Sequence, residues 1–287
     1  DAFAVCEAET AASAVDRVAP GLATARGITA ERVRTLAYTH AASELVATCE
    51  PTIAAAELAI EAATFDRTGS VAVRARDVRS QAGVSTQDAE RRLGSVLVDR
   101  GFTVDLDDPD HELRVLFSKG AVDGEPHEVC LIGWLAVESR RDFGERRPTD
   151  RPFFQPGSMD PLDARALVNI AGAKPGARIV DPMCGTGGVL LEAGLVGSNV
   201  VGVDAQWKMT RGSRENLDAL LGDDAAADVI HGDATALPLA DGCADGVVFD
   251  APYGRQSKIA RHELADLVGG ALSEARRLAD RAVMVAD

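Results

Sequence analysis

The chain has 287 residues, enough for two domains, and its mean hydropathy of -0.02 and lack of a long apolar run exclude a membrane-spanning protein. Its five cysteines lie far apart and form no C-x-x-C pair or Cys/His cluster, which excludes a zinc site or a disulfide framework and favours the reducing cytoplasm. The net charge of -15 argues against a phosphate-binding surface.

The cations of this acidic chain have an unusual composition, because only four of the 30 positive residues are lysine and the other 26 are arginine. Acid-rich, lysine-poor chains suit molar salt, where the Debye length shrinks to about 3 Å and self-repulsion is screened. The composition therefore predicts a halophilic source. In molar salt, release of counterions contributes little to binding, so if the protein binds RNA, it would have to hold it by shape, hydrogen bonds and stacking. An ordinary acidic protein that never meets nucleic acid is the alternative.

Residues 1–65 are rich in alanine and have a mostly helical pattern; we interpret them as an incomplete α+β, ferredoxin-like region. The pattern then becomes clearer, because Val71 and Val73 alternate with Arg74 and Arg76. This alternation predicts a strand with one apolar and one cationic face.

A helix and three more strands are expected next. Ser85 and Asp88 resemble a capping box for a helix that ends at Gly101. Alternating or continuous apolar residues predict strands over 102–106, 113–117 and 129–137. Together these elements predict a small α+β domain over residues 66–138.

The order of motifs over residues 66–138 is V-R-A-R, a capped helix, G-F-x-V-D-L and L-R-V. This order resembles the THUMP domain, an RNA-binding module found beside several tRNA-modifying catalytic domains. The resemblance implies that this domain binds tRNA, with Arg74, Arg76 and Arg79 as candidate contacts. A solvated strand face is the alternative for these arginines.

Residues 139–159 are expected to form an exposed linker, because the stretch 139–151 is highly charged and contains a proline. This stretch carries five arginines against three acids, so the local charge becomes positive. Arg140 and Arg141, with Arg255 further along, are candidate RNA contacts. A plain solvated linker is the alternative.

Beyond the linker, short apolar strands alternate with helices, as in a parallel sheet. Asp160 and Pro161 suit a helix start. A strand at 178–180 runs into D-P-M-C-G-T-G-G, residues 181–188, hereafter the glycine turn, and a helix follows. Glycines there let a ligand approach the backbone at the carboxyl end of a strand. The G-x-G-G spacing, with an acid ahead of it, favours a cationic or amine-bearing ligand over a pyrophosphate.

Acids recur at the ends of the next strands. Asp204 ends V-V-G-V-D, where a carboxylate can accept a ribose diol, and Asp233 follows a strand at 229–230. Together with Asp181, they predict a rim of acids around a cofactor.

The catalytic half, residues 160–287, resembles the class I S-adenosylmethionine-dependent methyltransferases through D-P-x-C-G-T-G-G, V-G-V-D and G-D-A. The resemblance implies an α/β, Rossmann-like methyltransferase domain after the α+β THUMP-type domain, and S-adenosylmethionine as cofactor, with no metal. Gln206 or Trp207 would flank the adenine; a core position is the alternative for Trp207. The implied cofactor-binding residues here are Asp181, Cys184, Gly185, Thr186, Gly187, Asp204, Gln206, Asp233 and Ala234.

The sequence D-A-P-Y-G at 250–254 resembles the (D/N)-P-P-(Y/F) motif of amino-methyltransferases, with Ala251 in place of the usual proline. An exocyclic amine is a poor nucleophile because its lone pair is delocalised into the ring. Asp250 and the backbone carbonyl at 251 can each accept one N–H bond and so direct the lone pair. The resemblance makes Asp250, Pro252 and Tyr253 catalytic, with Asp250 also beside the cofactor and Tyr253 stacked on the extruded base. A surface turn is the alternative.

The carboxylate also favours guanine over adenine, because guanine presents adjacent N1–H and N2–H donors. The stretch R-P-F-F-Q-P-G-S-M-D-P at 151–161 resembles the entry to the catalytic domain of archaeal tRNA (guanine-10-N2)-dimethyltransferases. This resemblance implies a cytoplasmic, haloarchaeal enzyme that methylates guanosine N2 in tRNA, at position 10. It also implies that Phe154 and Ser158 lie over the methionine end of the cofactor.

Three other functions are alternatives: methylation of another tRNA, rRNA or adenine amine, a non-catalytic tRNA-binding protein, and an NAD-dependent oxidoreductase. The glycine spacing disfavours the last of these. The chain starts at Asp1 without an initiator Met and stops at Asp287, directly after an apolar run, so we interpret it as C-terminally incomplete. The sequence gives no indication of the oligomeric state.

Overall fold

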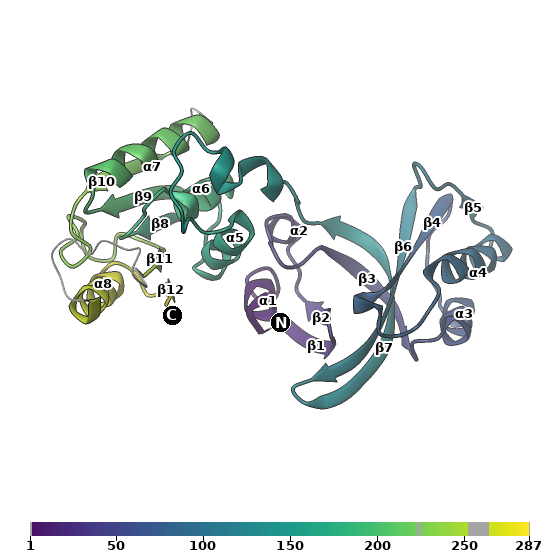
Figure 1. The fold of residues 1–287 in the computed structure, drawn as a ribbon. Helices are drawn as coiled ribbons and strands as arrows, with labels where there is room; N and C mark the ends of the chain where they lie inside the picture. Colours follow the sequence, from purple (N-terminus) through teal and green to yellow (C-terminus); the bar gives the residue numbers. More distant parts are fainter. Residues whose placement is uncertain (1, 223–224, 252–263, 287) are drawn as a thin grey trace. The chain divides into compact units, whose positions relative to one another are not determined.

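The computed structural model of the chain describes residues 2–222, 225–251 and 264–286 (Figure 1). The chain divides into two compact units. Unit 1 comprises Asp1–Arg34 and Thr39–Ser139, and unit 2 comprises Thr35–Tyr38 and Arg140–Asp287. Among the described residues, no helix combines the length and the apolar composition that crossing a membrane requires.

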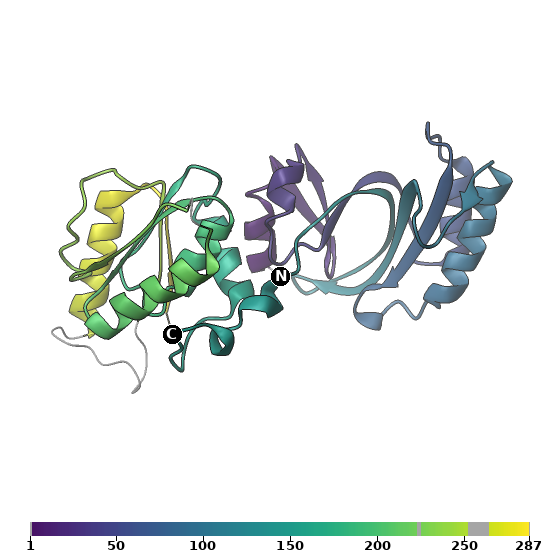
Figure 2. The ribbon, with the colours of Figure 1, turned by 90° about the horizontal axis from the view of Figure 1, so that it is seen from above.

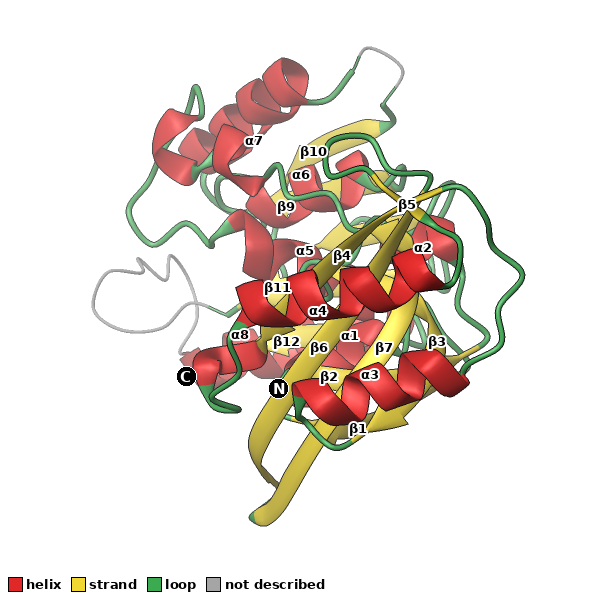
Figure 3. Cartoon of the chain, turned by 90° about the vertical axis from the view of Figure 1, so that its right-hand side faces the viewer, coloured by secondary structure: helices red, strands yellow, loops and turns green. Residues whose placement is uncertain are grey.

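Unit 1 is built around a five-stranded sheet with the order β3-β7-β6-β4-β5. Helices α3 and α4 pack side by side on one face, where Ile60, Leu93 and Leu97 are fully buried (Figure 3). The β1-β2 hairpin packs on the same sheet through a second cluster that contains Ala19 and Leu22. The elements of unit 1 are α1 (Ala2–Ala8), β1 (Ala14–Ala19), β2 (Leu22–Arg26), α2 (Ala30–Val33), β3 (Ala41–Cys49), α3 (Ile53–Ala62), β4 (Ser70–Asp77), η1 (Val78–Ser80), α4 (Thr86–Asp99), β5 (Thr103–Val104), β6 (His111–Val122) and β7 (Glu125–Glu138).

Several expected elements of unit 1 are confirmed. β4 buries Val71 and Val73, as the alternation predicts. Helix α4 begins after Ser85, whose hydroxyl accepts a hydrogen bond from the Asp88 backbone N–H at 3.3 Å. β6 and β7 cover the predicted strands at 113–117 and 129–137.

Two expectations for unit 1 are wrong. Residues 1–65 are not mostly helical, since they contain three strands, and β3 pairs with β7 along its length, so one sheet passes through both 1–65 and 66–138. Pairing with β7 overrides the helix preference of the alanines in β3. The strand expected over 102–106 is shortened to Thr103–Val104, because the Asp105 carboxylate accepts from the backbone N–H groups of Asp107 and Asp108, both at 3.0 Å, and a turn begins there.

Unit 2 contains a parallel five-stranded sheet with the order β10-β9-β8-β11-β12, the doubly wound order. Helices α5 and α6 cover one face of the sheet, and α8, yellow in Figure 2, covers the other. Successive residues of a strand face opposite sides, so Ile179 packs against α5 and α6, whereas Val180 packs against α8. The elements of unit 2 are η2 (Phe143–Arg146), η3 (Pro148–Asp150), α5 (Pro161–Ile170), β8 (Arg178–Asp181), α6 (Gly188–Leu195), β9 (Asn199–Asp204), α7 (Trp207–Leu220), β10 (Ala227–His231), β11 (Gly246–Asp250), α8 (Leu264–Leu278) and β12 (Ala282–Val285).

The strand order places a topological switch point between β8 and β11. From β8 the chain first adds β9 and β10 on one side and then returns to add β11 and β12 on the other. In sheets of this kind, ligands bind outside the carboxyl ends of the strands at such a point. The edge where the carboxyl ends meet, hereafter the carboxyl edge, is therefore the place to look for a site.

The segment 140–151 is packed against unit 2 rather than exposed as a linker. It forms the short turns η2 and η3, and Arg146 and Arg151 are buried. Arg146 donates two hydrogen bonds, at 2.6 and 3.0 Å, to the buried carboxylate of Glu192 in α6. The local charge excess predicts a solvated segment, but two of its five arginines, Arg146 and Arg151, are buried in unit 2.

Candidate functional site

Four carboxylates lie along the carboxyl edge. Asp181, Asp204 and Asp250 are the last residues of β8, β9 and β11, and Asp233 follows the end of β10. Neighbouring strands are in register there, since Asp204 pairs with His231 and Asp181 pairs with Gly202. The acids that the sequence placed at strand ends thus belong to one edge of one sheet.

The glycine turn joins β8 to α6 and has the conformation that its glycines permit. Gly185 and Gly187 have φ values of 52° and 81°, in the left-handed region that disfavours other residues. A Cβ on Gly187 would collide with the Ser213 hydroxyl, whereas a Cβ on Gly185 would meet nothing within 4 Å. The backbone at Gly185 is therefore open to a ligand.

Asp204 links the glycine turn to the start of α7. One carboxylate oxygen accepts from Gly185 N at 3.0 Å, and the other accepts from Gln206 N at 2.8 Å. Burial raises the pKa of Asp204, and these two hydrogen bonds oppose the rise. Each carboxylate oxygen can accept a second hydrogen bond, so Asp204 can still receive a pair of hydroxyl groups.

Asp181 is the most deeply buried of the four carboxyl groups. Burial and the nearby charges of Asp204 and Asp250 raise its pKa to about 8, against the opposing effect of a hydrogen bond from Met183 N at 2.9 Å. Asp181 is consequently protonated at neutral pH unless a cation lies beside it. A positively charged ligand fits this edge because it would stabilise the ionised carboxylate.

Asp250 has an acceptor atom without a partner. Its Oδ1 atom is buried and has no hydrogen-bond partner among the described residues, and burial raises its pKa. Buried polar atoms are nearly always hydrogen-bonded, so an open acceptor at a strand end suggests a ligand donor. The predicted partners of Asp250 in this loop, Pro252 and Tyr253, lie outside the described residues.

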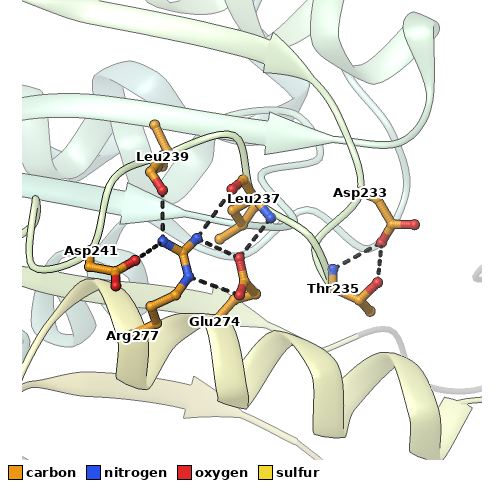
Figure 4. A network of polar contacts seen from close by, with 7 residues as sticks. All are labelled: Asp233, Thr235, Leu237, Leu239, Asp241, Glu274 and Arg277. Carbon is orange, nitrogen blue, oxygen red and sulfur yellow. Dashed lines mark hydrogen bonds and ion pairs between the residues drawn. The ribbon is translucent and has the colours of Figure 1, made fainter.

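The loop that carries Asp233 is held by helix α8 (Figure 4). One Asp233 oxygen accepts from the Thr235 N–H and hydroxyl at 2.9 and 2.8 Å. Further along, Glu274 accepts from Leu237 N at 2.7 Å. Arg277 completes the network with bonds to the Leu237 and Leu239 carbonyls, Glu274 and Asp241. Sequence reasoning missed Glu274 and Arg277, for which the only local signal was their spacing of three residues on a helix.

The segment that enters the catalytic domain lies against the glycine turn. Asn216 of α7, which is buried, donates to the carbonyls of Phe153 at 2.8 Å and Thr186 at 2.9 Å and accepts from Phe153 N at 2.8 Å. The Ser158 and Thr186 hydroxyls lie 3.0 Å apart. Ser158 and Thr186, both predicted to bind the cofactor, are thus brought together. Asn216 was missed, because a single polar residue in a helix carries no pattern.

The remaining predicted cofactor residues fall into two groups. Phe154 is 43% exposed, and Trp207 is 72% exposed and stacked on His231 with ring centroids 4.1 Å apart. The alternative core position for Trp207 is therefore wrong, because its ring stacks on the His231 ring and stays largely exposed. Cys184 and Ala234 are buried in the cores on either side of the sheet.

The candidate RNA contacts are not all available to a partner. Arg74 donates to the Leu106 carbonyl at 2.6 Å, and Arg141 donates to the Ala37 carbonyl. Arg76, Arg79 and Arg140 are exposed. Arg255 lies outside the described residues.

No group of three or more His, Cys, Asp or Glu residues suited to a metal ion occurs within 2–222, 225–251 and 264–286. The carboxylate side chains that the strands present at the carboxyl edge are hydrogen-bond acceptors. They suit an organic ligand with hydroxyl groups, an amine and a positive charge.

Similarity to known proteins agrees with this geometry. Residues 148–287 match the family described as RMKL-like, methyltransferase domain. The chain is 41% identical to the tRNA (guanine(10)-N2)-dimethyltransferase of Methanothermobacter thermautotrophicus, over 76% of this chain and 62% of that protein. It is 32% identical to the protein of the same name from Methanocaldococcus jannaschii, over 66% of this chain and 55% of that one.

A third relative has a different target position in its name. The chain is 33% identical to the tRNA (guanine(6)-N2)-methyltransferase of Thermus thermophilus, over 48% of this chain and 37% of that protein. The names of all three relatives specify the N2 atom of guanine. The chain spans about three fifths of the length of the first of these relatives and less of the other two.

Proposed function

Because residues 148–287 match the RMKL-like methyltransferase domain, we propose that this protein methylates the N2 amine of a guanosine in tRNA, at position 10, with S-adenosylmethionine as methyl donor. The M. thermautotrophicus and M. jannaschii relatives are named for that nucleotide. The T. thermophilus relative supports position 6 as a second candidate.

One observation carries the proposal: the Oδ1 atom of Asp250, at the switch point, is buried and has no hydrogen-bond partner within the part of the chain that the structure describes. A carboxylate there can accept an amine N–H and hold the nitrogen with its lone pair directed at an electrophile. It also relieves the positive charge that develops on the nitrogen during transfer. Positioning of the two reactants contributes a further large part of the rate.

The residues of the carboxyl edge fit S-adenosylmethionine, which when bound supplies an electrophilic methyl group on a positively charged sulfur. Gly185 leaves room at the turn, and the two oxygens of Asp204 can accept the ribose hydroxyls. Asp181 ionises more readily beside a positive charge. Asp233 lies beyond Asp204, at the end of the next strand, where it can accept from the adenine amine.

A carboxylate at position 250 favours guanine as the target. Guanine offers two adjacent donors, N1–H and N2–H, which match two acceptor oxygens, whereas adenine offers an acceptor beside its amine. Unit 1, with exposed Arg76 and Arg79, is proposed to be the THUMP-type tRNA-binding domain, and the protein to act in the cytoplasm of a halophile.

The decisive experiment is methylation of unmodified tRNA transcripts by the full-length protein in molar salt, with mapping of the product by mass spectrometry. We expect N2-methylguanosine or its dimethyl form at position 10. A transcript with inosine at that position lacks the N2 amine and should receive no methyl group there. Methylation of the inosine transcript at an equal rate would overturn the assignment, and a product at position 6 would favour the second candidate.

A further inference from the structure

A buried cluster of charged residues lies between α5, α6 and the segment 140–151. Arg146 donates two hydrogen bonds to Glu192, and Arg165 forms an ion pair with the same carboxylate at 2.7 Å. Asp142 pairs with Arg146 at 2.9 Å. Both oxygens of Glu192 are therefore already used by two of the arginines.

Arg151 is the third arginine of this cluster and is not neutralised in the same way. Its residue is 5% exposed, and its Nη1 and Nη2 atoms have no hydrogen-bond partner among the described residues. The Nε atom donates a hydrogen bond to the Arg146 carbonyl at 3.1 Å. A buried cation with open donors is costly, which suggests that an anion completes the site.

The guanidinium of Arg151 lies at the start of helix α6. A Cβ on Gly188, the first residue of α6, would be 2.9 Å from Nη1 of Arg151, so the arginine occupies the space that the missing side chain leaves. Gly188 follows Gly187 at the end of the glycine turn. The first N–H groups of a helix have no partner within the helix and favour anions. Two independent features, the helix start and the open guanidinium donors, thus point to one negative group.

Helix α5 begins beside the same place. The N-cap of α5 is Asp160, whose charge acts on Arg151 together with the charges of Glu192 and Arg146. The segment from Arg151 leads along the glycine turn to Ser158, whose hydroxyl lies 3.0 Å from that of Thr186. The guanidinium therefore lies next to the turn that the proposed cofactor would occupy.

We propose that Arg151 binds the α-carboxylate of the methionine part of the cofactor, through the two open nitrogens of its guanidinium. This inference rests on the proposed function. A guanidinium matches a carboxylate because two parallel N–H bonds can form in one plane. The start of α6 adds backbone donors on the same side. Arg151 would therefore make the site bind a cofactor that has the α-carboxylate more tightly than one that lacks it.

The test compares two ligands that differ only at the carboxylate. Binding of S-adenosylhomocysteine and of its decarboxylated analogue is measured by calorimetry with the full-length protein and with Arg151→Gln. We expect the protein to bind S-adenosylhomocysteine at least ten times more tightly than the analogue. Arg151→Gln should weaken S-adenosylhomocysteine by about 10- to 100-fold, the range for a hydrogen bond to a charged group, and the analogue by less than about twofold.

Arg146→Gln is the matched control, because Arg146 belongs to the same cluster but has its donors paired with Glu192 and Asp142. We expect it to lower the melting temperature and to change the two affinities by the same factor. Arg151→Lys keeps the charge without the planar pair of donors and should recover part of the preference for the carboxylate.

The outcomes separate this inference from the proposed function. Tight binding of both ligands by the unaltered protein, without preference, would overturn the role of Arg151 and leave the methyltransferase function intact. An equal loss for both ligands in Arg151→Gln would overturn it too, since a structural role predicts that result. If neither ligand binds the unaltered protein, the proposed function itself fails. Should Arg151→Gln not fold, the inference is tested by comparing the unaltered protein with Arg151→Lys. A preference for the carboxylate that is equally strong in both would overturn the role of the Arg151 guanidinium.

Discussion

Two groups of polar residues in unit 2 differ in how completely their hydrogen bonds are satisfied. In the network of Arg277 and Glu274, and in the pairing of Glu192 with Arg146, the charged groups meet each other or backbone carbonyls. At the carboxyl edge, Asp250 keeps an acceptor atom that has no partner among the described residues, and burial raises the pKa of Asp181 to about 8. The closed groups hold loops and helices in place. The open ones are where a ligand can contribute the missing partner.

Breaking the closed group in the core should have the largest effect on stability. Glu192→Gln leaves Arg146 and Arg165 buried without their shared anion, so we expect the free energy of unfolding to fall by about 3–5 kcal/mol. Chemical denaturation measures this loss. Asp142→Asn is the control, because Asp142 is partly exposed and should cost less than about 1 kcal/mol. Equal losses in the two variants would show that burial of the Glu192 pairs does not set their strength.

Removing the open acceptor should affect catalysis without affecting the fold. Asp250→Ala takes away the group proposed to bind the target amine, and loss of one such transition-state contact typically costs about 10²- to 10³-fold in rate. Single-turnover methylation of tRNA measures the rate, and calorimetry with S-adenosylhomocysteine checks that cofactor affinity changes little. Methyl transfer at the full rate by Asp250→Ala would show that the Asp250 carboxylate does not orient the target amine.

The buried acid at the end of β8 should couple ligand binding to pH. The pKa of Asp181 is about 8 in the folded protein, and a cationic ligand lowers it, so binding releases a proton. Affinity for S-adenosylmethionine should therefore rise with pH up to about 8, by at most about tenfold per pH unit, and then level off. S-adenosylhomocysteine has no sulfonium charge and should show a weaker trend.

Calorimetry in two buffers of different ionisation enthalpy counts the protons released, and Asp181→Asn should abolish the difference between the two ligands. The same pKa affects stability. Because the folded value lies above the ordinary value of 3.8, the native state holds this proton more tightly, and Asp181 makes the cofactor-free protein less stable as pH rises from about 4 to about 8. An identical pH dependence for both ligands would contradict the coupling.

The smallest effect should come from loosening the closed network around Asp233. Arg277→Met removes the bonds that fix the loop carbonyls of Leu237 and Leu239 to α8, so we expect cofactor affinity to fall by about 2- to 10-fold, the range for loss of one ordinary hydrogen bond, with little change in the rate at saturation. Arg276→Met, at the exposed neighbouring position, is the matched control. A fall in the saturated rate alone would show that Arg277 acts elsewhere.

In the catalytic half, local sequence patterns were enough to predict the glycine turn and the positions of the acids at the strand ends. The glycine turn between a strand and a helix, and an acid at each strand end, are encoded in short stretches, because backbone freedom and strand period are properties of neighbouring residues. Asp160 begins α5 and Asp204 ends β9, as expected. These patterns also place Asp181 and Asp250 at one edge once the strands are known to be parallel. The roles assigned to individual site residues stay predictions.

Only the tertiary structure decided which distant residues complete the site and which strands share a sheet. Asn216, Arg277 and Glu192 bind Phe153, Leu239 and Arg146, which lie 63, 38 and 46 residues away, and no local period marks these contacts. The pairing of β3 with β7 and the burial of Arg146 and Arg151 likewise depend on partners far along the chain. Burial changes the pKa of a carboxyl group and the cost of an open donor, and burial is set by the packing of the whole unit rather than by the residues on either side.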